Sequence, residues 1–121
     1  MEDNQKIIVV PWDFTPVAEN ALEHAVKISR MVGDSISLLH IVDPGIKKNV
    51  LGEKKILLQH VADENGRKYN IKITSHIAKG TIFTSIAEFV NEKDASLVVM
   101  GTHGIKGMQK LTGSWALKVL V

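Results

Sequence analysis

The sequence contains no cysteine, which excludes a disulfide framework and a thiolate metal site. No apolar run approaches the roughly 18 residues that a membrane-spanning helix needs. The opening residues, Met-Glu-Asp-Asn, lack the basic segment and long apolar stretch that mark a secretory signal. We therefore expect a cytoplasmic protein with no membrane partner.

Arginine and aromatic residues are scarce. Only Arg30 and Arg67 are arginines among the 15 basic residues, and aromatic residues make up 5% of the chain. A nucleic-acid groove needs arginines and stacking aromatics together. The densest basic cluster has neither, so we interpret it as solvated surface and expect no nucleic-acid partner; its members are Lys47, Lys48, Lys54 and Lys55.

Three motifs that would identify common α/β enzymes are also missing. The chain has no G-x4-G-K-[ST] phosphate loop, no G-x-G-x-x-G after its first apolar run and no G-x-S-x-G nucleophile elbow. These absences argue against a P-loop NTPase, a protein with the dinucleotide-binding fingerprint and an α/β-hydrolase.

What the chain does contain is a regular alternation of strand and helix patterns. Residues 7–10 are wholly apolar and end at Pro11, as in a strand covered on both faces. Thr15-Pro16 then opens a helix over 16–32, with Gly33 after its end. The same reasoning predicts a strand over 36–42, a helix over 50–65 stopped by Gly66, a strand over 71–77, a helix opened by Gly80-Thr81, a strand over 97–100 and a helix over 115–120.

This order predicts one α/β domain over residues 1–121, with a doubly wound parallel sheet and helices on both faces. The apolar strands at 7–10 and 97–100 should be central, and the alternating strand at 71–77 should lie at an edge. Residues 118–121 lie inside or just after a helix, where a β/α repeat would continue with a strand. We therefore expect the sheet to lack its last strand.

Ligands of open parallel sheets bind outside the carboxyl ends of the strands, where the strand order reverses. That rule places Asp13 beside the glycine-rich segment 101–107. A carboxylate there can accept a hydrogen bond from a ribose hydroxyl or an adenine amine, and glycines let backbone N–H groups approach phosphate. Ser114, opening a helix, adds a hydroxyl and the positive end of the helix dipole.

Each of these residues also has a purely structural interpretation. The glycines can be turn residues after a strand, Asp13 a turn residue at a helix entry and Ser114 a helix N-cap. His103 is either an acid–base group or a surface loop histidine, and the second is favoured because no partner acid or nucleophile is identifiable. The other four histidines share no metal-ligand spacing.

The segment Gly101-Thr102-His103-Gly104, followed by Gly113-Ser114 and preceded by the apolar strand 97–100, resembles the universal stress protein signature. That signature is a strand, then G-x2-G, nine residues and G-[ST]. Residues 9–15 and 38–44 are similar to the first and second strands of the same family. The resemblance covers essentially the entire chain in register.

The resemblance implies a Rossmann-like sheet of the adenine nucleotide α-hydrolase type, ordered 3-2-1-4-5, here 3-2-1-4 with the fifth strand missing. It implies a homodimer that functions in a stress response, and ATP with Mg²⁺ as ligands in the members that bind nucleotide. Adenosine would be held by Asp13 and the backbone of Ile41 or Val42, and ribose and phosphates by the glycine loop. The loop residues matched in this way are Met100 beside the ribose, then Gly101, Gly104, Gly113 and Ser114.

The chain departs from the family pattern in its glycine loop. Eight residues separate Gly104 from Gly113, where the signature has nine. One deletion displaces backbone donors by up to about 3.5 Å, which is enough to lose hydrogen bonds to phosphate. We expect an adenine-nucleotide-binding regulatory module with at most slow hydrolysis, because no base, arginine finger or metal-binding carboxylates can be assigned. The alternative is a dimeric interaction protein of the same fold that binds no nucleotide.

Overall fold

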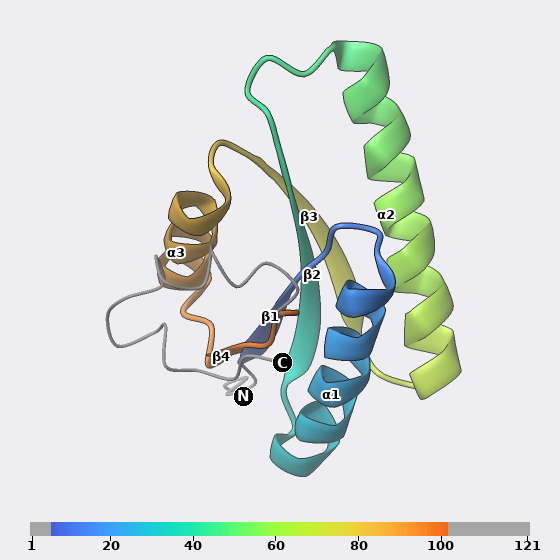
Figure 1. The fold of residues 1–121 in the computed structure, drawn as a ribbon. Coiled ribbons are helices and arrows are strands. Elements are labelled where there is room, and N and C mark those ends of the chain that lie inside the picture. Colours follow the sequence, from blue (N-terminus) through green and yellow to red (C-terminus); the bar gives the residue numbers. More distant parts are fainter. Residues whose placement is uncertain (1–5, 102–121) are drawn as a thin grey trace, which may run out of the picture.

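The computed structural model describes residues 6–101, which form a four-stranded parallel sheet with helices on both faces (Figure 1). The strand order is β3-β2-β1-β4, which confirms the order predicted from the sequence. The predicted helix over 115–120 lies outside the described residues. So do residues 118–121, on which the prediction of a missing last strand was based. The elements are β1 (Ile7–Pro11), α1 (Pro16–Val32), β2 (Ser35–Val42), α2 (Lys48–Tyr69), β3 (Ile73–Lys79), α3 (Ile82–Lys93) and β4 (Leu97–Val98).

The continuous apolar run of β1 is explained by its position at the centre of the sheet. It pairs with β2 on one side and with β4 on the other. Ile8, Val10 and Trp12 belong to the core beneath α1 and α2, whereas Val9 belongs to the core beneath α3. Because helices cover both faces (Figure 1), every side chain of the strand interior is buried and no polar alternation is needed.

Helix α1 begins and ends at the residues that the sequence predicted. The Thr15 hydroxyl accepts a hydrogen bond from the Ala18 N–H at 3.3 Å, and Pro16 occupies the first helical position. Gly33 ends the helix in the left-handed region, at φ 82°. These caps fix the start of α1 directly after the carboxyl end of β1.

Helix α2 is longer than predicted, and the expectation that Gly66 stops it is wrong. The helix continues to Tyr69 and ends at Asn70, which adopts φ 56°. Gly66 acts one turn before this end: its carbonyl accepts from the N–H of Ile71, and a Cβ at Gly66 would lie 3.2 Å from the Ile71 carbonyl oxygen. The glycine therefore allows the chain to fold back closely after the helix.

Strand β3 lies at the edge of the sheet and is mostly half-exposed, as its alternating sequence predicted. It pairs with β2 along its whole length, from Ile36↔Ile73 to Val42↔Lys79. Within residues 6–101, no helix is both long and apolar enough to cross a membrane.

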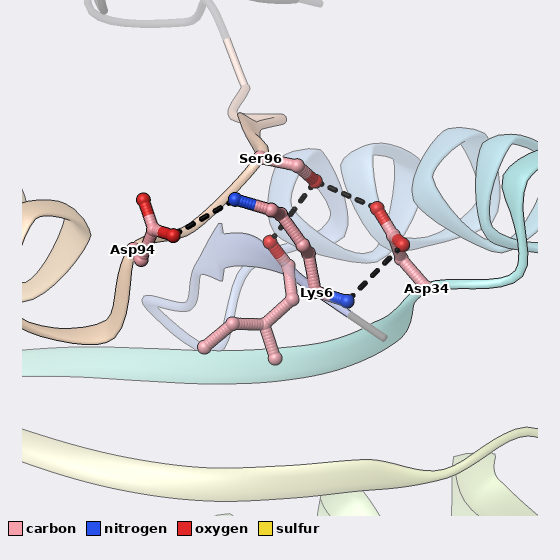
Figure 2. Close-up of polar contacts among 5 residues, drawn as sticks. Lys6, Asp34, Asp94 and Ser96 are labelled. Carbon is pink, nitrogen blue, oxygen red and sulfur yellow. Dashed lines mark hydrogen bonds and ion pairs between the residues drawn. The ribbon is translucent and has the colours of Figure 1, made fainter. Parts of the chain in front are cut away.

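Polar side chains join three segments at the amino-terminal ends of the strands. We call Lys6, Asp34, Asp94 and Ser96 the amino-edge network, and Figure 2 shows their contacts. The Asp34 carboxylate accepts from the Lys6 backbone N–H at 3.4 Å and from the Ser96 hydroxyl at 2.7 Å. The Lys6 ammonium lies 2.8 Å from the Asp94 carboxylate. The network connects the start of β1, the α1–β2 turn and the α3–β4 turn on the side opposite the cavity described next.

Candidate functional site

A cavity of about 530 Å³ lies where the carboxyl ends of the strands converge. Its walls come from the ends of β1 and β2, the first turn of α1, the β3–α3 loop and the residues after β4. This is the position at which open parallel sheets bind ligands. The lining residues are Pro11, Trp12, Asp13, Val17, Ala18, Leu39, His40, Ile41, Val42, Asp43, Pro44, Gly80, Thr81, Ile82, Met100 and Gly101.

The structure brings together every predicted site residue that it describes. Asp13, Ile41, Val42, Met100 and Gly101 all line this cavity, although they come from three separate strand ends. The other predicted residues are Gly104, Gly113 and Ser114, and they lie outside the described residues, as does His103.

Asp13 is both a turn residue and a cavity residue, so its two interpretations do not exclude each other. Its Oδ1 atom accepts from the Thr15 backbone N–H at 3.2 Å and from the Thr15 hydroxyl. The carboxyl group is exposed and lines the cavity. Because Thr15 also caps α1, the same contacts connect the cavity to the start of that helix.

Gly101 has a packing role that the sequence did not reveal. A Cβ at this position would lie 2.0 Å from Cγ1 of Val17 and 3.2 Å from the Val17 carbonyl oxygen. The backbone after β4 therefore presses directly against the first turn of α1, and any side chain at Gly101 would separate the two segments.

The β3–α3 loop closes another side of the cavity. The Gly80 N–H donates to the Val42 carbonyl at 3.0 Å, which fixes the loop to the end of β2. Gly80 has φ 143°, a conformation that side chains rarely adopt, and a Cβ there would meet the Ser85 hydroxyl oxygen at 2.8 Å. Gly80 and Thr81, which were predicted to open a helix, thus also help to shape the site.

His40 and Phe14 are neighbours at the site that sequence reasoning missed. His40 lines the cavity, and its Nδ1 lies 2.7 Å from the Trp12 carbonyl oxygen. Phe14 contacts the His40 ring edge-on, with centroids 5.0 Å apart and planes at 79°. The one sequence indication for His40 was its place directly before Ile41 at a strand end. Nothing in the sequence predicted that Phe14 would adopt φ 62°, an unusual value for a large side chain.

The environment of His40 favours its neutral form. Burial lowers the pKa of the imidazole below its ordinary value of 6.5, and the positive charge of Lys54 lowers it further. Two opposing influences are weaker than burial: the hydrogen bond to Trp12 and the negative charge of Asp13. At neutral pH the cavity therefore presents an uncharged imidazole.

A second, smaller cavity of about 440 Å³ lies between α1 and α2. Trp12 lines both cavities, although only 5% of its surface is exposed. Its indole Nε1 is buried and has no hydrogen-bond partner. Among the described residues, every other buried side-chain nitrogen or oxygen has one. Residues 6–101 also contain no group of three or more His, Asp or Glu side chains that could hold a metal ion.

These features define a doubly wound, Rossmann-like α/β protein with a ligand-sized crevice at the carboxyl edge of its sheet. The model of the universal stress protein family matches residues 5–120. The chain belongs to the universal stress protein family.

Curated and structural relatives agree with this assignment. Universal stress protein MJ0531 of Methanocaldococcus jannaschii is 27% identical over 132 residues, covering 98% of this chain and 78% of the relative. The fold resembles that of an Archaeoglobus fulgidus universal stress protein solved in complex with dAMP, with a TM-score of 0.73, 22% identity, and coverage of 97% of this chain and 95% of the other. It also resembles a universal stress protein solved in complex with cAMP, with a TM-score of 0.74, 16% identity, and coverage of 98% and 97%.

Proposed function

We propose that this protein is a regulatory module that binds an adenine nucleotide in the carboxyl-edge cavity and responds to it by a change of conformation or assembly. The observation that carries the proposal is the convergence of Asp13, the end of β2 and Gly101 on one cavity of about 530 Å³. Ligand cavities of proteins commonly range from about 300 to 1,000 Å³, so this volume is adequate for a nucleoside.

The lining chemistry suits the nucleoside part of such a ligand. Apolar walls formed by Val17, Leu39 and Ile82 offer a surface for a purine ring. Asp13 supplies an exposed carboxylate for a ribose hydroxyl or an amine, and the backbone of Ile41 and Val42 follows at the adjoining strand end. Two structural relatives were solved with dAMP and with cAMP, which supports an adenine nucleotide as the ligand class.

Within the proposal, the phosphates extend toward the glycine loop, whose residues Gly104, Gly113 and Ser114 keep the role given by the signature. Mg²⁺ would arrive as the counterion of a triphosphate, held chiefly by phosphate oxygens. Hydrolysis is not proposed beyond a slow background rate, because efficient phosphoryl transfer requires a positioned base and charged groups that stabilise the transition state.

The test is calorimetry of the full chain with ATP and Mg²⁺, using wild type and Asp13→Asn. The amide keeps an acceptor for Thr15 but removes the charge that would hold a ribose hydroxyl. We expect binding to weaken about ten- to a hundredfold, as for other hydrogen bonds to charged groups. Asp63→Asn is the matched control, because Asp63 lies on α2, outside the cavity, and accepts a hydrogen bond from Gln59.

Gly101→Val is unsuitable as the test variant, since the clash with Val17 would disturb the fold as well as the site. Saturable binding that is weakened by Asp13→Asn and unchanged by Asp63→Asn supports the proposal. The absence of heat at millimolar ATP would contradict it and favour a dimeric interaction protein of the same fold that binds no nucleotide.

Homodimer formation and a role in stress response remain predictions from the family resemblance, and a cytoplasmic location remains a prediction from the composition and the opening residues of the sequence. Sedimentation velocity with and without ATP tests the first of them. A regulatory module should change its sedimentation coefficient, its protection from proteolysis or both when nucleotide is added.

A further inference from the structure

The hydrogen bond between His40 and Trp12 determines which ring nitrogen of His40 carries the proton. A backbone carbonyl can only accept, so Nδ1, which lies 2.7 Å from the Trp12 oxygen, must be the protonated nitrogen. In the neutral ring, Nε2 then carries a bare lone pair. Nε2 makes no hydrogen bond to residues 6–101, and His40 is one of the residues that line the cavity.

Neighbouring side chains hold the His40 ring in place. Phe14 packs against it in a T-shaped arrangement, and the same phenyl ring makes a second T-shaped contact with Trp12, with centroids 6.4 Å apart and planes at 80°. On the outer side, the Lys54 ammonium lies 5.6 Å from the Phe14 ring centroid. The imidazole is therefore a preorganised group, and a ligand need not order it on binding.

The charged groups that face His40 are Asp13, from the end of β1, and Lys54, from α2. Their effects oppose each other, and burial decides the balance in favour of the uncharged ring. Near neutral pH, Nε2 is an acceptor. In acid it gains a proton and becomes a donor, so the same atom reverses its hydrogen-bonding preference.

Purine bases differ in the group that such an atom would meet. Adenine carries a 6-amino group, which donates, whereas hypoxanthine and guanine carry a 6-oxo group, which accepts. We propose that His40 makes the site selective for adenine over 6-oxopurines, by accepting a hydrogen bond from the 6-amino group at Nε2. This inference rests on the proposed function, because it concerns the base of the nucleotide bound in that cavity.

The test compares AMP with IMP, which differ at the 6-position and at the adjoining N1. The variant His40→Asn is chosen because the asparagine amide can still donate to the Trp12 carbonyl, as Nδ1 does, while nothing replaces Nε2. We expect wild type to prefer AMP about tenfold or more, since mismatching one buried hydrogen bond has an effect of this size. In His40→Asn the preference for AMP, defined as the Kd of IMP divided by the Kd of AMP, should fall to about one, mainly through weaker AMP binding.

His76→Asn is the matched control. His76 is the other half-buried histidine with a lowered pKa, but it lies on β3, contacts Phe89 and does not line the cavity. The preference for AMP over IMP should be unchanged in this variant. Equal weakening of AMP and IMP in His40→Asn would overturn the inference, because His40 would then contact a part common to both ligands.

A measurement on the wild-type protein covers the case in which His40→Asn fails to fold. In NMR titrations of the histidine ring nitrogens, AMP should stabilise the neutral Nδ1–H tautomer of His40 and lower its pKa, whereas IMP should not. The preference for AMP over IMP should also decline as the pH falls below 6.5, where Nε2 becomes a donor. The nucleotide phosphate titrates alike in both ligands, so the ratio removes its contribution.

A His40 titration that is identical with saturating AMP and with saturating IMP would refute the selectivity. If neither nucleotide binds wild type at millimolar concentration, the proposed function fails first and the selectivity fails with it. Binding of AMP and IMP with equal affinity leaves the proposed function standing and overturns only the role of His40.

Discussion

At the scale of single residues, Thr15 joins the stability of α1 to the geometry of the cavity. Its hydroxyl accepts from the Ala18 N–H and donates to the Asp13 carboxylate. We expect Thr15→Ala to lower the free energy of unfolding by about 1 kcal/mol, as for other lost helix N-caps. Urea denaturation followed by circular dichroism measures this change.

Thr81 provides the matched control for Thr15. It occupies the N-cap of α3, but its side chain makes no capping hydrogen bond there. Thr81→Ala should therefore change stability by less than half as much as Thr15→Ala. Equal losses in the two variants would contradict the capping role assigned to the Thr15 hydroxyl.

Two half-buried histidines make stability depend on pH. Burial is the main cause that lowers the pKa of His40 and of His76 below 6.5, and Lys54 and Lys93 respectively add to it. Between the folded and unfolded pKa values the unfolded chain binds more protons, so stability rises with pH in that window. The contribution should be complete above about pH 7 and be lost as the pH falls from 6.5 through the lowered values.

Urea denaturation of wild type and of the double variant His40→Asn/His76→Asn at several pH values measures this dependence. The variant should lose the part of the slope that lies just below pH 6.5. An unchanged slope in that range would show that other groups cause it.

At the scale of secondary-structure elements, the two glycines of α2 should respond differently to alanine. A Cβ at Gly52 would meet nothing within 4 Å, so Gly52→Ala should stabilise the protein by about 0.5–1 kcal/mol through helix propensity. A Cβ at Gly66 would lie 3.2 Å from the Ile71 carbonyl, so Gly66→Ala should gain less or be destabilising. Thermal and urea denaturation of both variants decide this; equal gains would contradict the close approach of Ile71.

Most elements could be predicted from the sequence because their patterns are local. Thr15-Pro16 and Gly33 marked the ends of α1, and the apolar run 7–10 marked a central strand. The expectation that the apolar strand over 97–100 is central is wrong for the described residues, because β4 pairs only with β1, at one end of the order β3-β2-β1-β4. The end of α2 could not be predicted, because a glycine such as Gly66 commonly ends a helix. The sequence does not show that Asn70 adopts the left-handed conformation and ends the helix instead. The strand predicted over 97–100 is shorter in the structure, although the Val99 N–H still donates to the Val9 carbonyl at 2.9 Å.

The site could be predicted only in part, for a related reason. Asp13 and Gly101 follow from topology, since parallel strands end at one edge of the sheet, whereas Ile41, Val42 and Met100 were expected from the family resemblance. The contribution of His40 depends on a contact with the Trp12 carbonyl across two strands, and that of Phe14 on a positive φ. Neither a non-local contact nor an unusual backbone angle leaves a local pattern in the sequence.

At the scale of the whole molecule, the amino-edge network holds together three segments that are distant in the chain. Asp34 accepts from the Lys6 N–H and the Ser96 hydroxyl, so Asp34→Ala removes both bonds to its carboxylate. We expect a loss of about 2 kcal/mol in unfolding free energy, because these bonds involve a charged acceptor. Urea denaturation measures it.

Lys6→Met is the comparison for this network. It removes only the ion pair with Asp94. The side chains of Lys6 and Asp94 are 50% and 85% exposed, so the loss in unfolding free energy should stay below about 1 kcal/mol. A larger loss in Lys6→Met than in Asp34→Ala would show that the surface ion pair, rather than the carboxylate of Asp34, joins the segments.

The position of Trp12 in the wall of both cavities has an optical consequence. Indole emission depends on the polarity around the ring, and Trp12 is buried, with no partner on its Nε1. The chain has two tryptophans, so Trp115→Phe leaves Trp12 as the single long-wavelength fluorophore. Any ligand that enters either cavity should then change the emission of this residue, which gives the protein a built-in spectroscopic probe that needs no label.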